Sequence, residues 1–235
     1  MINWQAVLLD IEGTVTPISF VHDVLFPYAR AHVESFLDSH SNQAEVQADI
    51  KKLREEQAID TEELRQLPIN SIDTVVTYVN RLIDLDRKSP ALKSLQGKIW
   101  KAGYEDGSLK SPVYPDVIDA FKRWRDAGIK INIFSSGSVL AQQLLFAHTD
   151  GGDLTRYIDQ YFDTSVGKKI DPESYATIAG KLSIDSTQLL FVSDVVAELY
   201  AAKEAGMQTR LCIRPGNPPQ PASQFQSITN FEGVP

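Results

Sequence analysis

Four short apolar runs along the chain predict buried strands. They span 6–9, 129–134, 188–192 and 209–213. The first, AVLL, is continuously apolar rather than alternating, and the other three resemble it. Such continuity is typical of strands that are covered on both faces of a parallel sheet.

Helical patterns separate these predicted strands. They cover 115–128, 138–149, 172–182 and 196–206. The first has a proline near its start and ends on Gly128, which is the expected helix punctuation. The alternation of strand and helix predicts an α/β fold with a doubly wound, mostly parallel sheet.

The region 16–111 has a different pattern and predicts an inserted, all-helical cap. Its stretches 42–57, 71–88 and 90–107 read as amphipathic helices. We therefore expect an α/β catalytic core made of 1–15 and 112–235, with the cap at the strand ends where open α/β sheets bind ligands. The proline-rich stretch 214–223 predicts an extended loop.

Composition narrows the classes of partner. The 235 residues include 43% hydrophobic ones, with 23 basic and 31 acidic side chains for a net charge of −8. This balance argues against nucleic acid and membrane surfaces as partners. The N-terminus lacks a basic leader, and no apolar run approaches the roughly 18–20 residues that span a bilayer. We expect a cytoplasmic monomer, in which the single Cys212 is a buried strand thiol.

Two acidic residues follow the first predicted strand. Asp10 ends the run, Glu12 comes two residues later, and Gly13 allows a tight turn between them and the following chain. Carboxylates at such a corner can hold a hard cation, attack phosphorus or move a proton. The alternative for this pair is a turn acid followed by a solvated glutamate.

Hydroxyl and amino groups follow other elements. Ser135 and Ser136 come after the second strand, and a loop with Lys168 and Lys169 precedes a predicted helix. Serine hydroxyls and exposed N–H groups suit a phosphoryl oxygen, and a lysine can neutralise a phosphate together with a carboxylate. The alternatives are a helix N-cap for the serines and solvated surface charges for the lysines.

A second acidic motif follows the apolar run at 188–192. Asp194 ends this strand, and Glu198 follows four residues later on the next helix. A helix N-cap and an exposed helix charge are the alternatives for these two acids. Each motif is weak alone, but their order along the chain predicts that all of them meet at one edge of a parallel sheet.

This order of motifs resembles the haloacid dehalogenase superfamily of phosphohydrolases. Longer strings are similar to the bifunctional enolase-phosphatases of methionine salvage, or acireductone synthases: DIEGTVTPISFVHDVLFPYAR, FSSGS, LLFAHTDGGDL, FDTSVGKK and IRPGN. The chain departs from the superfamily at Glu12, where most members have aspartate.

The resemblance implies a substrate and a reaction. The small phosphorylated diketone 2,3-diketo-5-methylthiopentyl 1-phosphate would be enolised and then dephosphorylated. The products would be the acireductone 1,2-dihydroxy-3-keto-5-methylthiopentene and phosphate, with one Mg²⁺ per chain as cofactor.

The resemblance also implies roles for individual residues. Asp10 matches the nucleophile, which forms an aspartyl phosphate and binds Mg²⁺. Glu12 matches a metal contact through its backbone carbonyl, and its side chain is a candidate acid or base. Asp194 matches the remaining carboxylate ligand. Lys169, six residues before Tyr175, matches the superfamily lysine, which leaves Lys168 as a surface residue.

Substrate recognition is expected from the motif after the second strand and from the cap. Ser135 and Ser136 match the contacts to phosphate and substrate. Apolar cap residues either line the pocket for the methylthio end or form ordinary cap core; they are Phe20, Leu25, Phe26, Trp100 and Tyr104.

Three other functions compete with this interpretation. One is a phosphatase or phosphomutase of the same superfamily that acts on another small phosphorylated metabolite. Another is a dehalogenase, which uses a similar aspartate without a metal. The third is a receiver-like module that only accepts a phosphoryl group on Asp10, although such modules are usually shorter and lack a cap.

Overall fold

The computed structural model describes residues 4–67, 69–85, 87 and 89–234. The chain divides into two compact units. One comprises Met1–Val21 with Lys110–Pro235, and the other comprises His22–Leu109. Each unit is described below by itself.

The first unit contains a six-stranded parallel sheet, so the predicted α/β fold is confirmed. The strand order is β3-β2-β1-β4-β5-β6, which puts β1 in the interior of the sheet. Two short strands, β3 and β6, were not predicted. The strands are β1 (Ala6–Leu9), β2 (Lys130–Phe134), β3 (Gln160–Phe162), β4 (Leu189–Ser193), β5 (Gln208–Cys212) and β6 (Ser227–Ile228).

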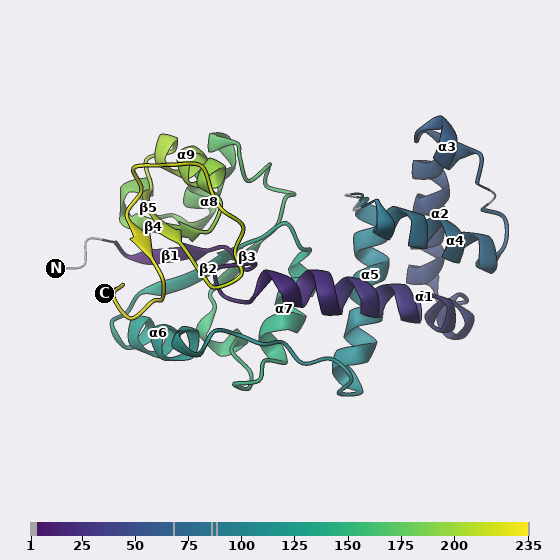
Figure 1. Cartoon of the computed structure of the whole chain (residues 1–235), viewed down its shortest axis with the longest axis horizontal. Helices are drawn as coiled ribbons and strands as arrows, with labels where there is room; N and C mark the ends of the chain where they lie inside the picture. The colour runs from purple at the N-terminus through teal and green to yellow at the C-terminus, as the bar shows by residue number, and fades with distance from the viewer. Residues whose placement is uncertain (1–3, 68, 86, 88, 235) are drawn as a thin grey trace. The chain divides into compact units, whose positions relative to one another are not determined.

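The centre of the sheet is buried because helices cover both of its faces. Every residue of β1 and β4 is buried, as their unbroken apolar sequences predict. Figure 1 shows α8 and α9 on one face and α6 and α7 on the other. These helices are α6 (Pro115–Asp126), α7 (Val139–Ala147), α8 (Pro172–Leu182) and α9 (Val196–Glu204).

Aromatic side chains fill the core on each face of the sheet. Tyr175 of α8 is fully buried, with its ring 5.5 Å from that of Phe134 and 5.0 Å from that of Phe191. On the other face, the fully buried Trp124 of α6 lies 6.1 Å from Phe121 between ring centroids. Two short 3-10 helices, Thr155–Tyr157 and Ser186–Gln188, complete this unit.

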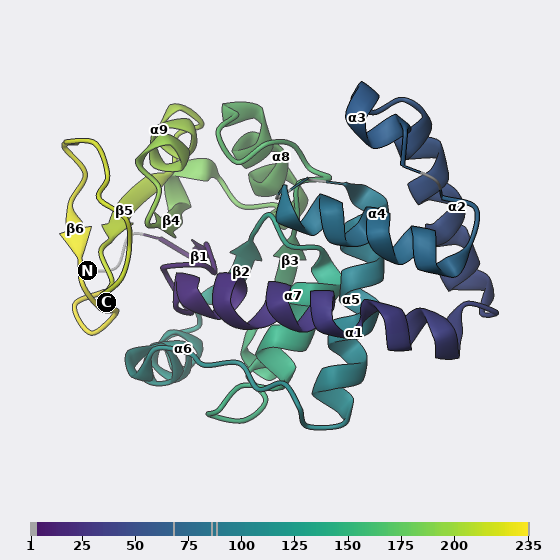
Figure 2. The same ribbon diagram turned by 45° about the vertical axis from the view of Figure 1, so that its right-hand side comes forward.

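The second unit is built of helices. They are α1 (Phe26–His40), α2 (Ala44–Ala58), α3 (Glu62–Arg65), α4 (Ile72–Asp84) and α5 (Pro90–Glu105), preceded by the π-helical turn Phe20–Leu25. Helix α1 packs against α4 and α5 (Figure 2). Helix α2 also packs against α5. The three predicted helices correspond to α2, α4 and α5, whereas α1 was not predicted. Positions 86 and 88, at the end of one predicted helix, lie outside the described residues.

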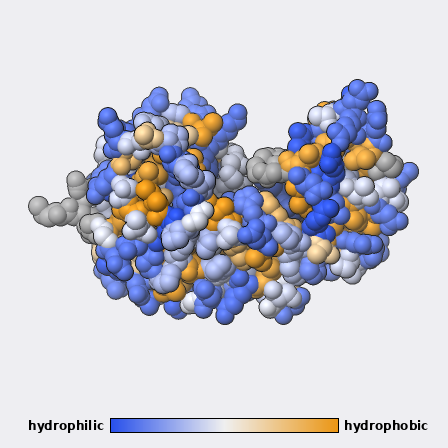
Figure 3. Space-filling model, in the orientation of Figure 1, coloured by the Kyte–Doolittle hydropathy of each residue, from blue (hydrophilic) through white to orange (hydrophobic). Residues whose placement is uncertain are grey.

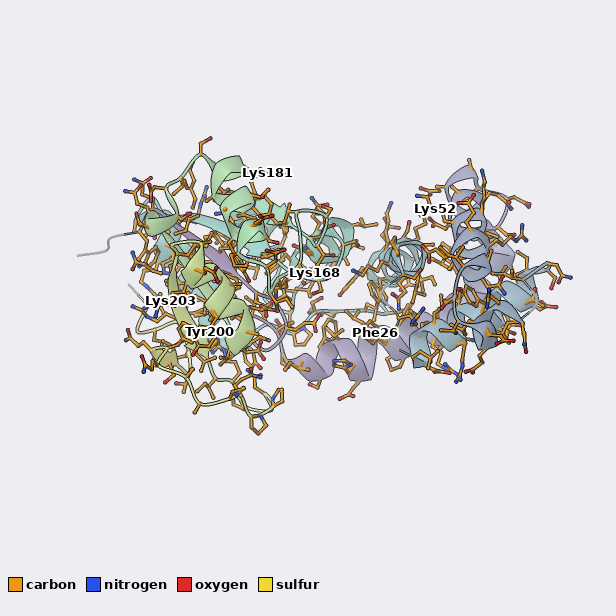
Figure 4. All side chains as sticks on the ribbon, turned by 90° about the horizontal axis from the view of Figure 1, so that it is seen from above. Phe26, Lys52, Lys168, Lys181, Tyr200 and Lys203 are labelled. Carbon is orange, nitrogen blue, oxygen red and sulfur yellow. The ribbon has the colours of Figure 1, made fainter. Side chains whose placement is uncertain are left out.

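Leu25, Phe26, Trp100 and Tyr104, singled out in the sequence as cap residues, lie in the second unit. Leu25 and Trp100 are buried, and the Trp100 indole N–H donates to the Leu25 carbonyl at 2.8 Å. Phe26, labelled in Figure 4, stacks on Trp100 with ring centroids 6.4 Å apart. Tyr104 is also buried, and so is Phe20, which belongs to the first unit. These contacts are those of cap core, and a role in lining a substrate pocket stays a prediction.

The two units divide later in the chain than the predicted boundary between 15 and 16. The Val15 carbonyl accepts from the Tyr114 N–H at 3.0 Å, and the Thr16 hydroxyl donates to the Pro112 carbonyl at 2.5 Å. These bonds attach the start of the predicted insertion to the chain that follows it. The first unit therefore extends to Val21.

The visible surface is mostly hydrophilic, with apolar residues scattered over it (Figure 3). The large apolar side chains that are exposed in the described part of the chain belong to different elements, as is usual for single surface hydrophobes; examples are Ile59, Leu140, Ile170 and Tyr200. None of the described helices combines the length and the apolar character needed to span a membrane.

Candidate active site

The end of β1 places Asp10 inside the first unit, at the carboxyl edge of the sheet. The Asp10 N–H donates to the Val192 carbonyl at 3.0 Å, so the pairing with β4 continues for one residue beyond the strand. Asp10 is only 4% exposed. Its carboxylate is therefore a buried charge, which needs a charged or hydrogen-bonding partner.

Lys169 supplies that partner. Its ammonium lies 2.5 Å from Asp10 Oδ1 and 2.8 Å from Glu198 Oε2. Lys169 is itself 8% exposed. Burial opposes its charged form, but the carboxylates of Asp10 and Glu198 outweigh this and raise the pKa of Lys169 above its ordinary value. Lys169 is thus held as a cation between two acids.

Two adjacent lysines of the same loop have opposite environments. The Tyr175 hydroxyl donates to the Lys169 carbonyl at 2.6 Å and fixes the backbone there. Lys168 is exposed, and Figure 4 labels it on the loop that precedes α8. Only its carbonyl is tied to the helix, through the Ser174 hydroxyl at 2.7 Å. The structure therefore brings Lys169, and not Lys168, to Asp10.

Asp194 and Glu198 place two more carboxylates at this edge. Asp194 follows β4 and is 4% exposed, and Glu198, in the first turn of α9, is 8% exposed. Burial, with the charges of Asp10 and Glu198, raises the pKa of Asp194 to about 7. The expectation of an exposed helix charge at Glu198 is wrong, because its carboxylate is buried, paired with Lys169 and accepts from the Ser193 hydroxyl at 2.9 Å.

The buried charges at this edge do not balance within the cluster. The carboxylates of Asp10 and Glu198 contact the Lys169 ammonium, and Asp194 is a third buried acid near them. Burying unpaired charge is costly, so a bound divalent cation would stabilise the cluster. Among the described residues, no group of three or more His, Cys, Asp or Glu side chains is placed so that it could hold a metal ion by itself. The donor set fits Mg²⁺, which binds one or two carboxylates and keeps several waters.

Gly13 brings the first motif against Asp194. Its φ is +70°, and a Cβ at this position would stand 2.5 Å from Asp194 Oδ2 and 2.9 Å from Asn217 Oδ1. Only glycine fits such a turn without displacing these side chains. Glu12, which precedes it, is half-buried and pairs through its backbone with Thr16. A metal contact through the Glu12 carbonyl stays a prediction.

The two serines after β2 differ from each other. Ser135 is buried; its N–H donates to the Phe162 carbonyl and its hydroxyl accepts from the Gly137 N–H, both at 3.1 Å. Ser136 is exposed. The cap of α7 is Ser138, so neither predicted serine is needed for that role. Because β1 and β2 pair in parallel, Leu9 opposite Ile133, Ser135 emerges at the same sheet edge as Asp10.

Sequence reasoning missed two side chains at this edge. Ser193 precedes Asp194 at a strand end, and the criterion that selected Ser135 applies equally to it. Asn217 lies in the IRPGN string after β5, and its amide N–H donates to the Gly13 carbonyl at 2.9 Å. A Pro-Gly-Asn turn signals a change of chain direction, but it does not reveal which distant segment the asparagine contacts.

Comparison with known proteins places the chain among hydrolases. The family model of haloacid dehalogenase-like hydrolases matches residues 4–206. The enolase-phosphatase E1 of Synechococcus elongatus is 50% identical, over 98% of each chain. A probable bifunctional methylthioribulose-1-phosphate dehydratase/enolase-phosphatase E1 of Arabidopsis thaliana is 46% identical, over 97% of this chain and 47% of that protein. The crystal structure of the Unknown transcript 4 protein of Saccharomyces cerevisiae superposes with a TM-score of 0.83 at 38% identity, covering 99% of this chain and 100% of that one.

The tight packing at Gly13 predicts that replacing it with alanine destabilises the protein more than the same change at an uncrowded glycine. We expect Gly13→Ala to lower the free energy of unfolding by about 2–5 kcal/mol, through backbone strain and displacement of the buried Asp194 carboxylate. Gly128→Ala is the matched control, because Gly128 has a φ of +76° with open space around it. In the control, only backbone strain should lower the free energy of unfolding, by about 1–2 kcal/mol. Urea denaturation followed by circular dichroism measures both, and equal losses would contradict the close packing of Gly13 on Asp194.

Proposed function

The chain belongs to the enolase-phosphatase E1 family of haloacid dehalogenase-like hydrolases, and we propose that Asp10, Lys169, Asp194 and Glu198 form its active site. Its reaction is the conversion of 2,3-diketo-5-methylthiopentyl 1-phosphate to the acireductone 1,2-dihydroxy-3-keto-5-methylthiopentene and phosphate, in methionine salvage. The observation that supports this site best is the buried ion pair of Asp10 and Lys169 at the carboxyl edge of β1.

This ion pair addresses the main difficulty of the reaction, which is that a carboxylate must attack an anionic phosphate. The Lys169 ammonium contacts Asp10 Oδ1 and lowers the local negative charge. Asp10 Oδ2 is 3.5 Å from the Ser193 hydroxyl. We assign the attack on phosphorus to the Asp10 carboxylate, which is held in a fixed position by these contacts.

The proposed transfer takes place in two steps. The Asp10 carboxylate forms a bond to phosphorus while the bond from phosphorus to the substrate oxygen breaks, and that oxygen takes up a proton. Water then attacks the aspartyl phosphate, which releases inorganic phosphate and restores the carboxylate. Ser135 and Ser136 would donate hydrogen bonds to the phosphoryl oxygens during both steps.

A magnesium ion fits the same edge of the sheet. The carboxylates of Asp10 and Asp194 and the Glu12 carbonyl would hold one ion per chain. When bound, Mg²⁺ supplies positive charge that stabilises the phosphoryl group and the substrate carbonyl. The Glu12 side chain is half-buried in the turn after β1, and we propose it as the acid or base of the enolisation.

The proposal extends to the compartment and the oligomeric state of the protein. Cys212 is a free, buried thiol in β5, which suits a reducing compartment. We propose that the protein acts in the cytoplasm as a monomer on a small-molecule substrate.

The assignment of the substrate predicts that phosphate and an absorbing enediol product form together. With the diketone phosphate, we expect phosphate release together with ultraviolet absorbance from the enediol product, and EDTA should abolish both until Mg²⁺ is restored. Sugar phosphates should give little phosphate under the same conditions. Faster phosphate release from a sugar phosphate would favour the rival phosphatase or phosphomutase, and activity that survives chelation would favour a metal-free enzyme.

The assignment of Asp10 as the nucleophile predicts that replacing one of its carboxylate oxygens with an amide nitrogen blocks phosphate transfer. Asp10→Asn keeps the shape of the side chain but removes the nucleophilic carboxylate, so phosphate release should fall by at least about a thousandfold. Asp126→Asn, at an exposed position, is the control and should keep full activity. A malachite-green assay measures release, and circular dichroism checks the fold. Substantial turnover by a folded Asp10→Asn variant would refute the assignment.

The contrast between adjacent lysines predicts unequal effects of the same substitution. Lys169→Ala removes the buried cation between Asp10 and Glu198, and kcat/KM should fall by roughly a hundredfold or more. Lys168→Ala removes an exposed charge and should change kcat/KM by less than about threefold. Steady-state kinetics compares the two, and similar losses would show that the wrong lysine has been placed in the site.

A further inference from the structure

A short turn after β5 holds the catalytic loop from a distant part of the sequence. The Arg214 guanidinium donates through Nε to the Thr14 carbonyl at 3.1 Å, and the Asn217 amide donates to the Gly13 carbonyl at 2.9 Å. The Asn217 N–H donates to the Arg214 carbonyl at 3.2 Å and closes the turn. Two consecutive carbonyls of the loop after Asp10 therefore depend on this turn.

Arg214 fixes this turn to the rest of the first unit through several buried contacts. Its guanidinium is 5% exposed and contacts both carboxylate oxygens of Asp116, at 2.8 and 2.9 Å. It also lies over the rings of Tyr114 and Phe231, at 4.3 and 4.9 Å from their centroids. Because Asp116 balances its charge, we assign Arg214 to holding the loop rather than to neutralising the acids of the active site.

Asn217 differs from Arg214 because its side-chain amide nitrogen is hydrogen-bonded but its amide oxygen is not. Its Nδ2 faces the Gly13 carbonyl, which can only accept, so the orientation of the amide is determined. Its Oδ1 is buried and has no hydrogen-bond partner. Buried amide oxygens are nearly always satisfied in folded proteins, so an unpaired one indicates a missing donor.

The neighbour of this oxygen is another acceptor. Asn217 Oδ1 and Asp194 Oδ2 lie 2.9 Å and 2.5 Å from one point, the position of a Cβ on Gly13. Because both oxygens lie within 3 Å of that point, one water molecule between them can donate a hydrogen bond to each. Asp194 is the carboxylate that the proposed function assigns to Mg²⁺, whose ligand shell is completed by waters.

We propose that Asn217 is a positioning residue for the magnesium site: its Nδ2 holds the Gly13 carbonyl, and its Oδ1 accepts a hydrogen bond from a metal-bound water beside Asp194. The inference rests on the Mg²⁺ site of the proposed function. Groups that orient metal ligands and bound waters in this way contribute about 10–100-fold to metal affinity. Asn217 therefore acts on the reaction through the metal and the loop, without touching the substrate.

Direct metal binding tests this proposal without any need for turnover. Isothermal titration calorimetry of the metal-stripped full chain with MgCl₂ gives Kd for the wild type, Asn217→Ala, Asn217→Asp and Asn230→Ala. Asn230 is the matched control, since its amide oxygen accepts a local bond from the Glu232 N–H at 3.1 Å in the same C-terminal segment. Melting temperatures of the metal-free variants check the fold.

The proposal predicts a particular order of affinities. Asn217→Ala should raise Kd by about 10–100-fold, and Asn230→Ala should leave it within about twofold. Asn217→Asp keeps an oxygen beside Asp194 but loses the donor to Gly13, so it should bind Mg²⁺ more tightly than Asn217→Ala. Without metal, Asn217→Asp should melt at a lower temperature than Asn217→Ala, because its second carboxylate oxygen faces the Gly13 carbonyl and its charge lies beside Asp194.

Each contrary outcome has a distinct meaning. An unchanged Kd in Asn217→Ala overturns the proposal while the Mg²⁺ site itself stands. If Asn217→Asp binds no more tightly than Asn217→Ala, the oxygen has no part in metal binding and the residue only holds the loop. If the wild type does not bind Mg²⁺, the metal site of the proposed function fails, and this inference fails with it.

Discussion

A buried lysine between two buried carboxylates is the interaction on which the site depends. Lys169 contacts Asp10 and Glu198 at 2.5 and 2.8 Å, and all three residues are almost inaccessible to solvent. Removing Lys169 from this group would leave uncompensated negative charge in the interior, which is strongly destabilising. The end of β1, the loop before α8 and the first turn of α9 are therefore constrained together, and Asp194 adds a further charge that favours a cation.

The parallel sheet explains why much of this arrangement was predictable from sequence. Unbroken apolar runs identified β1 and β4, and acids immediately after them had to emerge at one edge because neighbouring parallel strands share an orientation. Asp10, Ser135 and Asp194 were selected on this basis. Choosing Lys169 over Lys168 required the resemblance to a family, because an amphipathic pattern does not distinguish neighbouring lysines on a loop.

Other features depend on contacts that a local pattern does not contain. Strand β3 has three residues, of which Gln160 is exposed and Tyr161 half-buried, so its periodicity is too short to identify. Asn217 and Gly13 are 204 residues apart, and their contact depends on the packing of β5 beside β4. Glu198 has the sequence context of a surface helix charge, and only the position of Lys169 makes it a buried partner.

The most direct test of the account is to identify the residue that carries the phosphoryl group during turnover. A reaction with the diketone phosphate is quenched, reduced with borohydride, which converts an aspartyl phosphate to homoserine, and analysed by peptide mass spectrometry. The account predicts homoserine at position 10 in the wild type, and its loss when substrate is omitted. Reduction at Asp194 or another carboxylate, or unmodified Asp10 under conditions where an acyl phosphate accumulates, would contradict it.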